Sequence, residues 1–262
     1  MTPGAHAFAT GRGGVIAAPA AFAVMVAVAL GSAGPARAQE PAAPPQAVAA
    51  PPKPFVLSRP GKLSRWAFVQ RRTAARARPS ASAKRVTTLT TRTPERTDNL
   101  VLALERTEVD GKLWVRVRLP ILPNNRTGWV RRGDLGVYRT VTTRLIVDTR
   151  RFTARLVRRG RTAFRARIGV GEGRWPTPKG EFYVRNRLSG FSDPVYGPLA
   201  FGTSARSAVL TDWPAGGFVG IHGTNQPGLL PGRVSHGCIR LRNADIRRLA
   251  RRMPVGTPIT IR

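Results

Sequence analysis

Short runs of alternating apolar and polar residues dominate the chain from about residue 65 onward, and they predict a protein built mostly of β-strands. The clearest signal is a hairpin, in which strands over 100–106 and 113–119 flank an Asp110-Gly111 pair suited to a tight turn. Along the second strand the side chains are expected to alternate between a buried face, with Val115, Val117 and Leu119, and an opposite face, with Trp114, Arg116 and Arg118. This is the pattern of a half-buried strand in a small barrel.

The C-terminal part of the chain begins with an apolar strand over 144–147 and continues through short apolar segments broken by Gly and Pro, so it is also expected to be mostly β. One helix is predicted near the end, with Asn243 as its N-cap. Its buried face is expected to contain Ile246, Leu249, Ala250 and Met253. Pro254 ends this helix, and a last strand covers 258–261.

The first 38 residues have the features of a secretory signal: Arg12, an apolar run over 15–30, and a small-residue cleavage box at Ala36-Arg37-Ala38. The apolar run is shorter than the roughly 20 residues that a membrane span needs. We therefore expect cleavage after Ala38, with an uncleaved anchor as the alternative. No stable membrane span is expected after cleavage.

The rest of the chain divides into three segments by composition and pattern. Residues 39–64 are rich in Pro and Ala, which favours an extended spacer that buries no core. Residues 65–138 and 139–262 are then expected to form two small β domains, with one or two short helices in the second.

The chain is strongly basic, with 44 Lys plus Arg against 13 Asp plus Glu and a net charge of +31. Such a charge favours anionic partners. A composition this rich in Arg can also be common to the proteins of the same source, without any link to a partner. No recognition-helix, aromatic RNA-binding or zinc motif accompanies the charge, so no dedicated nucleic-acid function is expected. Anionic polymers of the cell envelope are the partner that the charge favours.

The chain contains a single cysteine, Cys238, and an exported protein cannot build an intramolecular disulfide from one cysteine. Three uses remain: an inert buried thiol, an intermolecular bridge, or a reactive nucleophile. The chain has three histidines, of which His6 lies in the predicted signal. The other two, His222 and His236, both lie within 16 residues of the thiol.

This clustering points to nucleophilic chemistry. A thiol with a pKa near 8.5 is mostly protonated at neutral pH, and a neighbouring histidine can take or balance its proton. Gly237 permits a close substrate approach, and the backbone N–H groups of Gly237 and Cys238 can face a developing oxyanion. A structural zinc site wants four ligands, so one Cys and two His fit it poorly and no metal is expected. Two core histidines beside an inert thiol remain the alternative.

Two motifs, Ile221-His222-Gly223-Thr224 and Ser235-His236-Gly237-Cys238, resemble the signature of the YkuD L,D-transpeptidases. The resemblance covers about 140–261 and includes the Thr-Pro-x-Gly-x-Phe segment at 177–182, Arg240 and the closing segment 254–258. It implies a β-sandwich catalytic domain.

The resemblance also implies roles for particular residues. Cys238 matches the nucleophile, and His222 matches its base, oriented by the carbonyl of Gly223. His236 matches a histidine that shapes the pocket, and Gly237 matches an oxyanion position. Ser235 and Arg240 match positions that brace the loop, while gripping a substrate carboxylate is the other role for Arg240. The predicted substrate-binding residues are Arg240, Thr224 and Tyr196, and the turn beneath the site is expected to be fixed by Thr177, Pro178, Gly180 and Phe182.

The implied function is that of a peptidoglycan L,D-transpeptidase located in the cell envelope or secreted. Such an enzyme needs no cofactor, forms a thioacyl-enzyme with release of D-Ala, and makes 3-to-3 cross-links between stem peptides. Acylation by carbapenems is expected as well. Two alternatives stay open: hydrolysis of the same thioester, as in an L,D-carboxypeptidase, and a wall-binding protein without activity.

Residues 65–138 resemble the bacterial SH3-like domains of cell-wall enzymes. The likeness rests on the segments 67–69, 110–117 and 127–130 and implies a small β-barrel. Wall binding and structural bracing of the catalytic domain are both open as its role.

Overall fold

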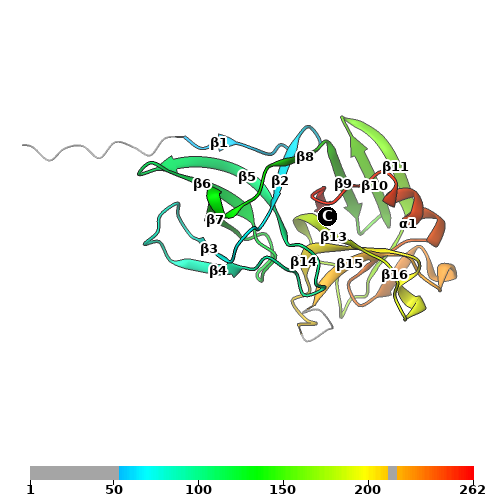
Figure 1. Ribbon diagram of the computed structural model, residues 1–262. Helices are drawn as coiled ribbons and strands as arrows, with labels where there is room; N and C mark the ends of the chain where they lie inside the picture. Colours follow the sequence, from blue (N-terminus) through cyan, green and yellow to red (C-terminus); the bar gives the residue numbers. More distant parts are fainter. Residues whose placement is uncertain (1–52, 212–216) are drawn as a thin grey trace, which may run out of the picture. The chain divides into compact units, whose positions relative to one another are not determined.

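The structure is a computed structural model that describes residues 53–211 and 217–262. The predicted signal segment and the first part of the predicted spacer lie outside the described residues. Within the described ranges, no helix is both long enough and apolar enough to span a membrane. The secondary structure is mostly β, as predicted, and is arranged in two sheets (Figure 1).

The N-terminal sheet contains eight strands and has the order β4-β3-β7-β6-β5-β2-β8, with β1 paired to β5. A 3-10 turn, η1 (Arg132–Asp134), follows β7. The strands are β1 (Phe55–Val56), β2 (Ser64–Phe68), β3 (Thr73–Arg76), β4 (Arg85–Leu89), β5 (Leu100–Val109), β6 (Lys112–Arg118), β7 (Thr127–Arg131) and β8 (Arg139–Val141).

The predicted hairpin is formed by β5 and β6, which pair in antiparallel fashion. Asp110 and Gly111 both have positive φ angles, 50° and 65°, which is the backbone of the tight turn that such a pair favours. Val115 and Val117 are fully buried, as predicted. The opposite face is less exposed than the alternation implied, because Trp114 is only 2% exposed and the guanidinium of Arg131 covers its ring at 4.7 Å. The SH3-like character of this sheet stays a prediction.

The N-terminal sheet begins before the end of the predicted spacer. β1 pairs with β5, and Leu57 packs into the core at 4% exposure. The hydroxyl of Ser58 donates to the carbonyl of Ala103 at 2.5 Å and accepts from the backbone N–H of Arg65 at 2.8 Å. The sequence did not predict this strand, because two residues within a Pro-rich segment show almost no periodicity.

The C-terminal sheet contains ten strands in the order β11-β10-β9-β18-β13-β14-β15-β17-β12-β16. Two 3-10 turns, η2 (Pro194–Tyr196) and η3 (Pro227–Leu229), and one helix, α1 (Asn243–Ala250), interrupt its strands. The strands are β9 (Thr143–Asp148), β10 (Thr153–Arg158), β11 (Arg161–Arg167), β12 (Gly169–Gly171), β13 (Gly180–Leu188), β14 (Ala200–Arg206), β15 (Phe218–His222), β16 (Gly232–Ser235), β17 (Ile239–Arg240) and β18 (Pro258–Ile261).

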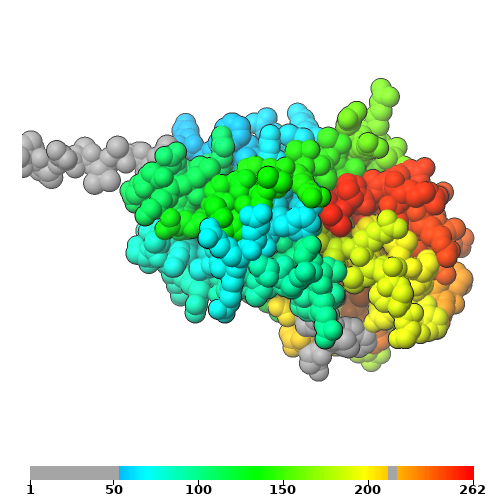
Figure 2. Space-filling view, viewed as in Figure 1, coloured from blue at the N-terminus to red at the C-terminus, as the bar shows by residue number. Residues whose placement is uncertain are grey.

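Strand β13 joins the two halves of this sheet. Its first residues, 180–183, pair with β18, and its later residues, from Val184 onward, pair with β14. In the space-filling view the C-terminal segment, drawn in red, adjoins a yellow part of the chain (Figure 2). One strand therefore belongs to both halves, which is consistent with the expected β-sandwich.

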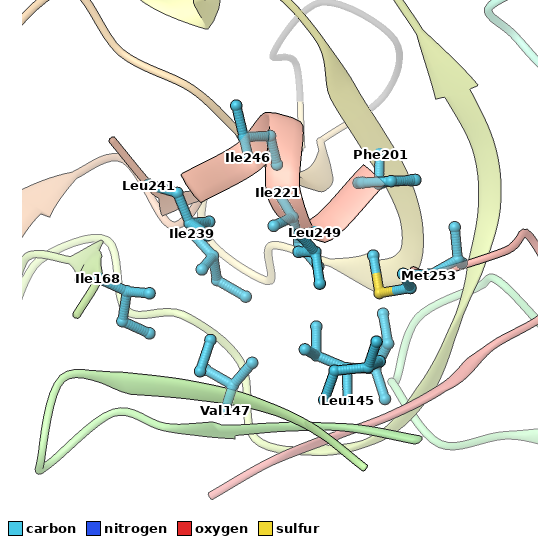
Figure 3. Packing of buried hydrophobic residues seen from close by; sticks show 14 of the residues in the cluster. Leu145, Val147, Ile168, Phe201, Ile221, Ile239, Leu241, Ile246, Leu249 and Met253 are labelled. Carbon is cyan, nitrogen blue, oxygen red and sulfur yellow. The ribbon is translucent and has the colours of Figure 1, made fainter. Parts of the chain in front are cut away.

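The core of the C-terminal sheet lies between its two halves (Figure 3). Leu145 and Val147 of β9 face Ile221 and Ile239, which come from β15 and β17, and each of the four is fully buried. Helix α1 adds Ile246 and Leu249 to the same cluster, while Met253 follows at 2% exposure. The predicted buried face of the helix is confirmed for these three, and Ala250 is partly buried against them.

The start of the helix differs from the prediction. Asn243 is the first residue of α1, and the N-cap is Arg242, whose side chain makes no capping hydrogen bond. The side chain of Asn243 instead accepts from the backbone N–H of Thr224 at 2.9 Å. Tertiary structure supplied a nearer donor than the free amides of the helix.

The two sheets contact each other through β13 and its neighbours. Trp66, Leu100 and Leu102 of the N-terminal sheet form a buried apolar cluster with Val141 and Tyr183. The hydroxyl of Tyr183 donates to the carbonyl of Leu100 at 3.2 Å. This contact is buried, so it fixes the strand β13 against β5.

Replacing Leu145 with Ala is expected to lower the free energy of unfolding by about 2–5 kcal/mol, because a fully buried leucine leaves a cavity that the two halves of the sandwich cannot close. Urea unfolding monitored by circular dichroism measures this loss. The control is Val137→Ala at a 76% exposed position, where a change below about 0.5 kcal/mol is expected. Equal losses for both variants would contradict the assigned core.

Candidate active site

The pairing of β15 with β17 brings the cysteine and one histidine together. These strands are parallel, with Ile221 opposite Ile239 and His222 opposite Arg240. The same register, continued one residue earlier, sets Gly220 opposite Cys238. Because side chains alternate along a strand, the two isoleucines enter the core, and the thiol and imidazole share the other face.

Cys238 is partly buried at the start of β17. The backbone N–H of Gly220 donates to its Sγ at 3.4 Å. Burial raises the pKa of this thiol, and the Gly220 N–H and the charge of Arg240 act against that rise. The raised pKa favours the protonated form of the thiol.

His222 is 3% exposed, and the pKa of its imidazole is lowered to about 4. Burial is the main cause, the hydrogen bond to Gly223 opposes the shift, and the charge of Arg240 adds to it. Its Nδ1 lies 2.6 Å from the carbonyl oxygen of Gly223. A carbonyl only accepts, so Nδ1 carries the proton and Nε2 keeps a free lone pair. Gly220 separates the two groups, since a Cβ built there would lie 3.7 Å from His222 and 3.8 Å from Cys238 Sγ.

The loop before Cys238 is held by hydroxyl groups. Gly237 has a φ of +108°, a conformation that side chains disfavour. Its backbone N–H donates to Ser235 Oγ at 3.2 Å, and Ser235 Oγ donates to the carbonyl of Cys238 at 2.6 Å. Thr177 donates to the carbonyl of Gly237 at 2.9 Å and accepts from the N–H of Gly171 at 2.8 Å. The segment containing Thr177 thus lies directly beneath the nucleophile loop.

A second support lies beneath His222. Asn243 accepts from the N–H of Thr224, and the carbonyl before that amide, on Gly223, is the partner of His222. Thr224 is 1% exposed, and its hydroxyl accepts from the N–H of Gln226 at 3.0 Å. Thr224 lies outside both cavities described below, while Asn243, predicted only as a helix cap, holds the segment that orients the imidazole.

Two hollows meet at Cys238 and His222. The first has a volume of about 270 Å³. It is called the polar hollow here because its lining includes Asp193, Ser207, Ser235, His236 and Arg240. The second, about 260 Å³, is the apolar hollow, with Leu188, Phe191, Ala200, Phe201 and Glu95 among its lining residues. Both hollows are lined by Tyr196, Phe218, Val219, His222 and Cys238.

Aromatic rings line the entrance to this pair of hollows. His236 is exposed and stacks on Trp175 with ring centroids 3.9 Å apart. Tyr196 meets the ring of His222 edge-on at 5.1 Å. Tyr196 therefore lies against the imidazole of His222, whereas His236 lies at the exposed edge of the polar hollow.

Arg240 lines the polar hollow, half-buried. Its Nε has no hydrogen-bond partner among the described residues. The backbone of Arg240 pairs with β12 and β15, and its side chain lines the hollow. Its role, gripping or bracing, stays a prediction.

Phe218 and Glu95 are among the lining residues that the sequence did not predict. Phe218 stands two residues before Gly220 on β15, so alternation alone places it on the face of the thiol. That signal was available once β15 was recognised as a strand. Glu95 lies in the loop between β4 and β5, more than 120 positions from the motif, and no local pattern connects it to the site.

Comparison of the sequence with known proteins identifies the family. The family model of the YkuD L,D-transpeptidase catalytic domain matches residues 142–261. The putative L,D-transpeptidase YkuD of Bacillus licheniformis is 35% identical over 122 residues, which cover 47% of this chain and 67% of the relative. The protein of the same name in Bacillus subtilis is 39% identical over 94 residues, 36% of this chain and 50% of the relative. The chain belongs to the YkuD L,D-transpeptidase family, whose members are acyltransferases.

Solved structures give weaker likenesses. The catalytic domain of an Enterococcus faecium L,D-transpeptidase is 26% identical, with 46% of this chain and 96% of that chain covered and a TM-score of 0.35. An L,D-transpeptidase from Mycobacterium smegmatis is 18% identical, with 58% and 90% covered and a TM-score of 0.38. The family match begins at residue 142, and this chain spans half the length of the Bacillus subtilis relative.

Protein stability is expected to fall by about 3 kcal/mol as the pH drops from 6.5 to 4, because the unfolded chain protonates His222 near pH 6.5 and the folded chain only near pH 4. Above pH 6.5 both states are neutral, and this contribution is constant. Urea unfolding across the pH range measures it. In His222→Gln this step should disappear, and an unchanged pH dependence in that variant would contradict the burial of a neutral imidazole.

Proposed function

We propose that this protein is a cysteine L,D-transpeptidase that acts on peptidoglycan stem peptides in the cell envelope. The observation that carries the proposal is the register of β15 and β17, which supports a nucleophile at Cys238 and a base at His222 on one face of the sheet. Family membership supports the reaction class and the cell-wall substrate.

In the proposed first step, Sγ of Cys238 attacks the carbonyl carbon between residue 3 and the terminal D-Ala of a tetrapeptide stem. The pKa of the thiol is raised and that of His222 is lowered, so the resting pair is neutral and not an ion pair. His222 therefore takes the thiol proton through Nε2 as the C–S bond forms. The carbonyl oxygen becomes an oxyanion, for which the backbone N–H of Cys238 is the proposed donor, because that of Gly237, predicted as a second donor, bonds to Ser235 Oγ.

The imidazolium then returns the proton to the nitrogen of D-Ala, the C–N bond breaks, and a thioacyl-enzyme remains. In the second step the side-chain amine of residue 3 on another stem attacks the thioester carbon, and His222 accepts the proton of that amine. The C–S bond breaks, the thiol recovers its proton, and a 3-to-3 cross-link is released. Arg240, which lines the polar hollow, is proposed to hold the carboxylate of D-Ala there.

Incubation of the mature protein with a carbapenem is expected to add one inhibitor mass, because a strained lactam carbonyl replaces the stem peptide as acyl donor. Mass spectrometry of intact protein measures the adduct. Cys238→Ala should gain none, and His222→Gln should react at least tenfold more slowly, in line with the loss of a general base. An adduct on Cys238→Ala would overturn the nucleophile.

Incubation with a disaccharide-tetrapeptide is expected to give a dimer joined through two residues at position 3, with D-Ala released. Mass spectrometry of the products measures it. A disaccharide-tripeptide without dimer would mean that water resolves the thioester and that the protein is an L,D-carboxypeptidase. Absence of any product with wild-type protein that binds wall material would favour a wall-binding protein without activity.

A further inference from the structure

The apolar hollow beside Cys238 is completed by the other sheet. Glu95, in the loop between β4 and β5, is the one acidic residue among its described lining residues. The loop that carries it is closed by hydrogen bonds between Thr93 and Thr97, through both backbone and hydroxyl groups. A solvent-exposed ion pair joins Arg92 to Asp98 at 3.0 Å in the same loop.

Glu95 is bound by two neighbouring residues of β13. A terminal nitrogen of Arg185 donates to both carboxylate oxygens, at 2.5 and 2.7 Å. Nδ2 of Asn186 donates to the same carboxylate at 3.2 Å. Arg185 is only 2% exposed, and a buried cation without such a partner would be strongly unfavourable. The N-terminal sheet thus supplies the counter-charge for a cation inside the C-terminal sheet.

Arg185 in turn packs on the wall of the site. Its guanidinium carbon lies 3.6 Å from the centroid of the Phe218 ring, and that of Arg206 lies 5.0 Å from the same centroid. Arg206 is itself fixed to the N-terminal sheet, because its backbone N–H and carbonyl both bond to the side chain of Asn124. Phe218 lines both hollows and shares the face of Cys238. A continuous series of contacts therefore runs from Glu95 to the space beside the thiol.

We propose that Glu95 is a positioning residue for acyl transfer, acting through Arg185 on Phe218 to set the wall that both hollows share. The inference rests on the proposed function. Glu95 acts on substrate fit and leaves the thiol and imidazole untouched. The N-terminal sheet is then a part of the active site, in addition to any role in wall binding.

The test variant is Glu95→Gln, which keeps the size of the side chain and an oxygen acceptor for Arg185 but removes the charge. The matched control is Glu105→Gln in the same sheet, which removes a carboxylate paired with Arg116 at 2.9 Å and lines neither hollow. Side-chain exposure is similar at the two sites, 14% for Glu95 and 19% for Glu105. The paired arginines differ in exposure, 2% for Arg185 and 41% for Arg116, so the unfolding temperature of each variant is measured beside its activity.

Carbapenem acylation and transfer from disaccharide-tetrapeptide are measured well below the unfolding temperature of each variant. For Glu95→Gln we expect roughly a tenfold lower kcat/KM, with most of the change in KM, because a displaced wall misplaces the substrate. The pH profile should match that of the wild type, since Cys238 and His222 keep their surroundings. Glu105→Gln should stay within about twofold of the wild type.

A double-variant cycle tests the route of the effect. In a Phe218→Leu background, Glu95→Gln should cause little further loss, because the ring through which it acts is gone. Additive losses would overturn the route through Phe218. Should Glu95→Gln fail to fold, Glu95→Asp keeps the charge beside Arg185 and shortens the reach by one methylene, and a several-fold lower kcat/KM is expected.

The two proposals fail in different ways. A wild-type protein that is not acylated overturns the proposed function. A wild-type protein that is acylated, with Glu95→Gln or its Asp substitute reacting like Glu105→Gln, overturns the role of Glu95 and leaves the proposed function intact. A shifted pH profile in Glu95→Gln would also overturn it, since that result would mean that the carboxylate acts on the titrating pair.

Discussion

The parallel pairing of β15 with β17 is the constraint on which the site depends. A shift of one residue in this register would send the thiol into the core and bring Ile239 to the surface, because side chains alternate between the two faces of a strand. Burial of Ile221 and Ile239 between the halves of the sandwich makes such a shift costly. Hydrophobic packing on one face therefore determines the geometry of polar groups on the other.

The same burial sets the proton chemistry. Burial of Cys238 and His222 favours the neutral form of each side chain. It therefore raises the pKa of the thiol and lowers the pKa of the imidazole. The hydrogen bond from Nδ1 of His222 to Gly223 selects the tautomer with a free Nε2. Asn243 and Thr177 support the two loops from outside the hollows. The thiol and the imidazole are thus both favoured in their neutral forms.

Strand β13 connects this site with the rest of the protein. Its first half pairs with β18, its second half pairs with β14, and its side chains reach the N-terminal sheet through Tyr183 and Arg185. The loop of Glu95 could not be anticipated as a neighbour of Cys238, because loop contacts across two sheets have no local periodicity. The hairpin at Asp110-Gly111 and the strand over 258–261 were predictable, since each rests on contacts between residues close in sequence or on a clear alternation.

The candidate chemistry and several strands follow from the sequence. One thiol, two nearby histidines and their glycines are the candidate reacting groups, and the apolar pattern predicts the hairpin strands and the buried face of α1. The fold brings the groups together: Gly220 beside thiol and imidazole, Asn243 beneath Thr224, and Glu95 behind Phe218. The physical reason is that local patterns encode which face of an element is buried, whereas the partners across sheets follow from register and packing that no single segment contains.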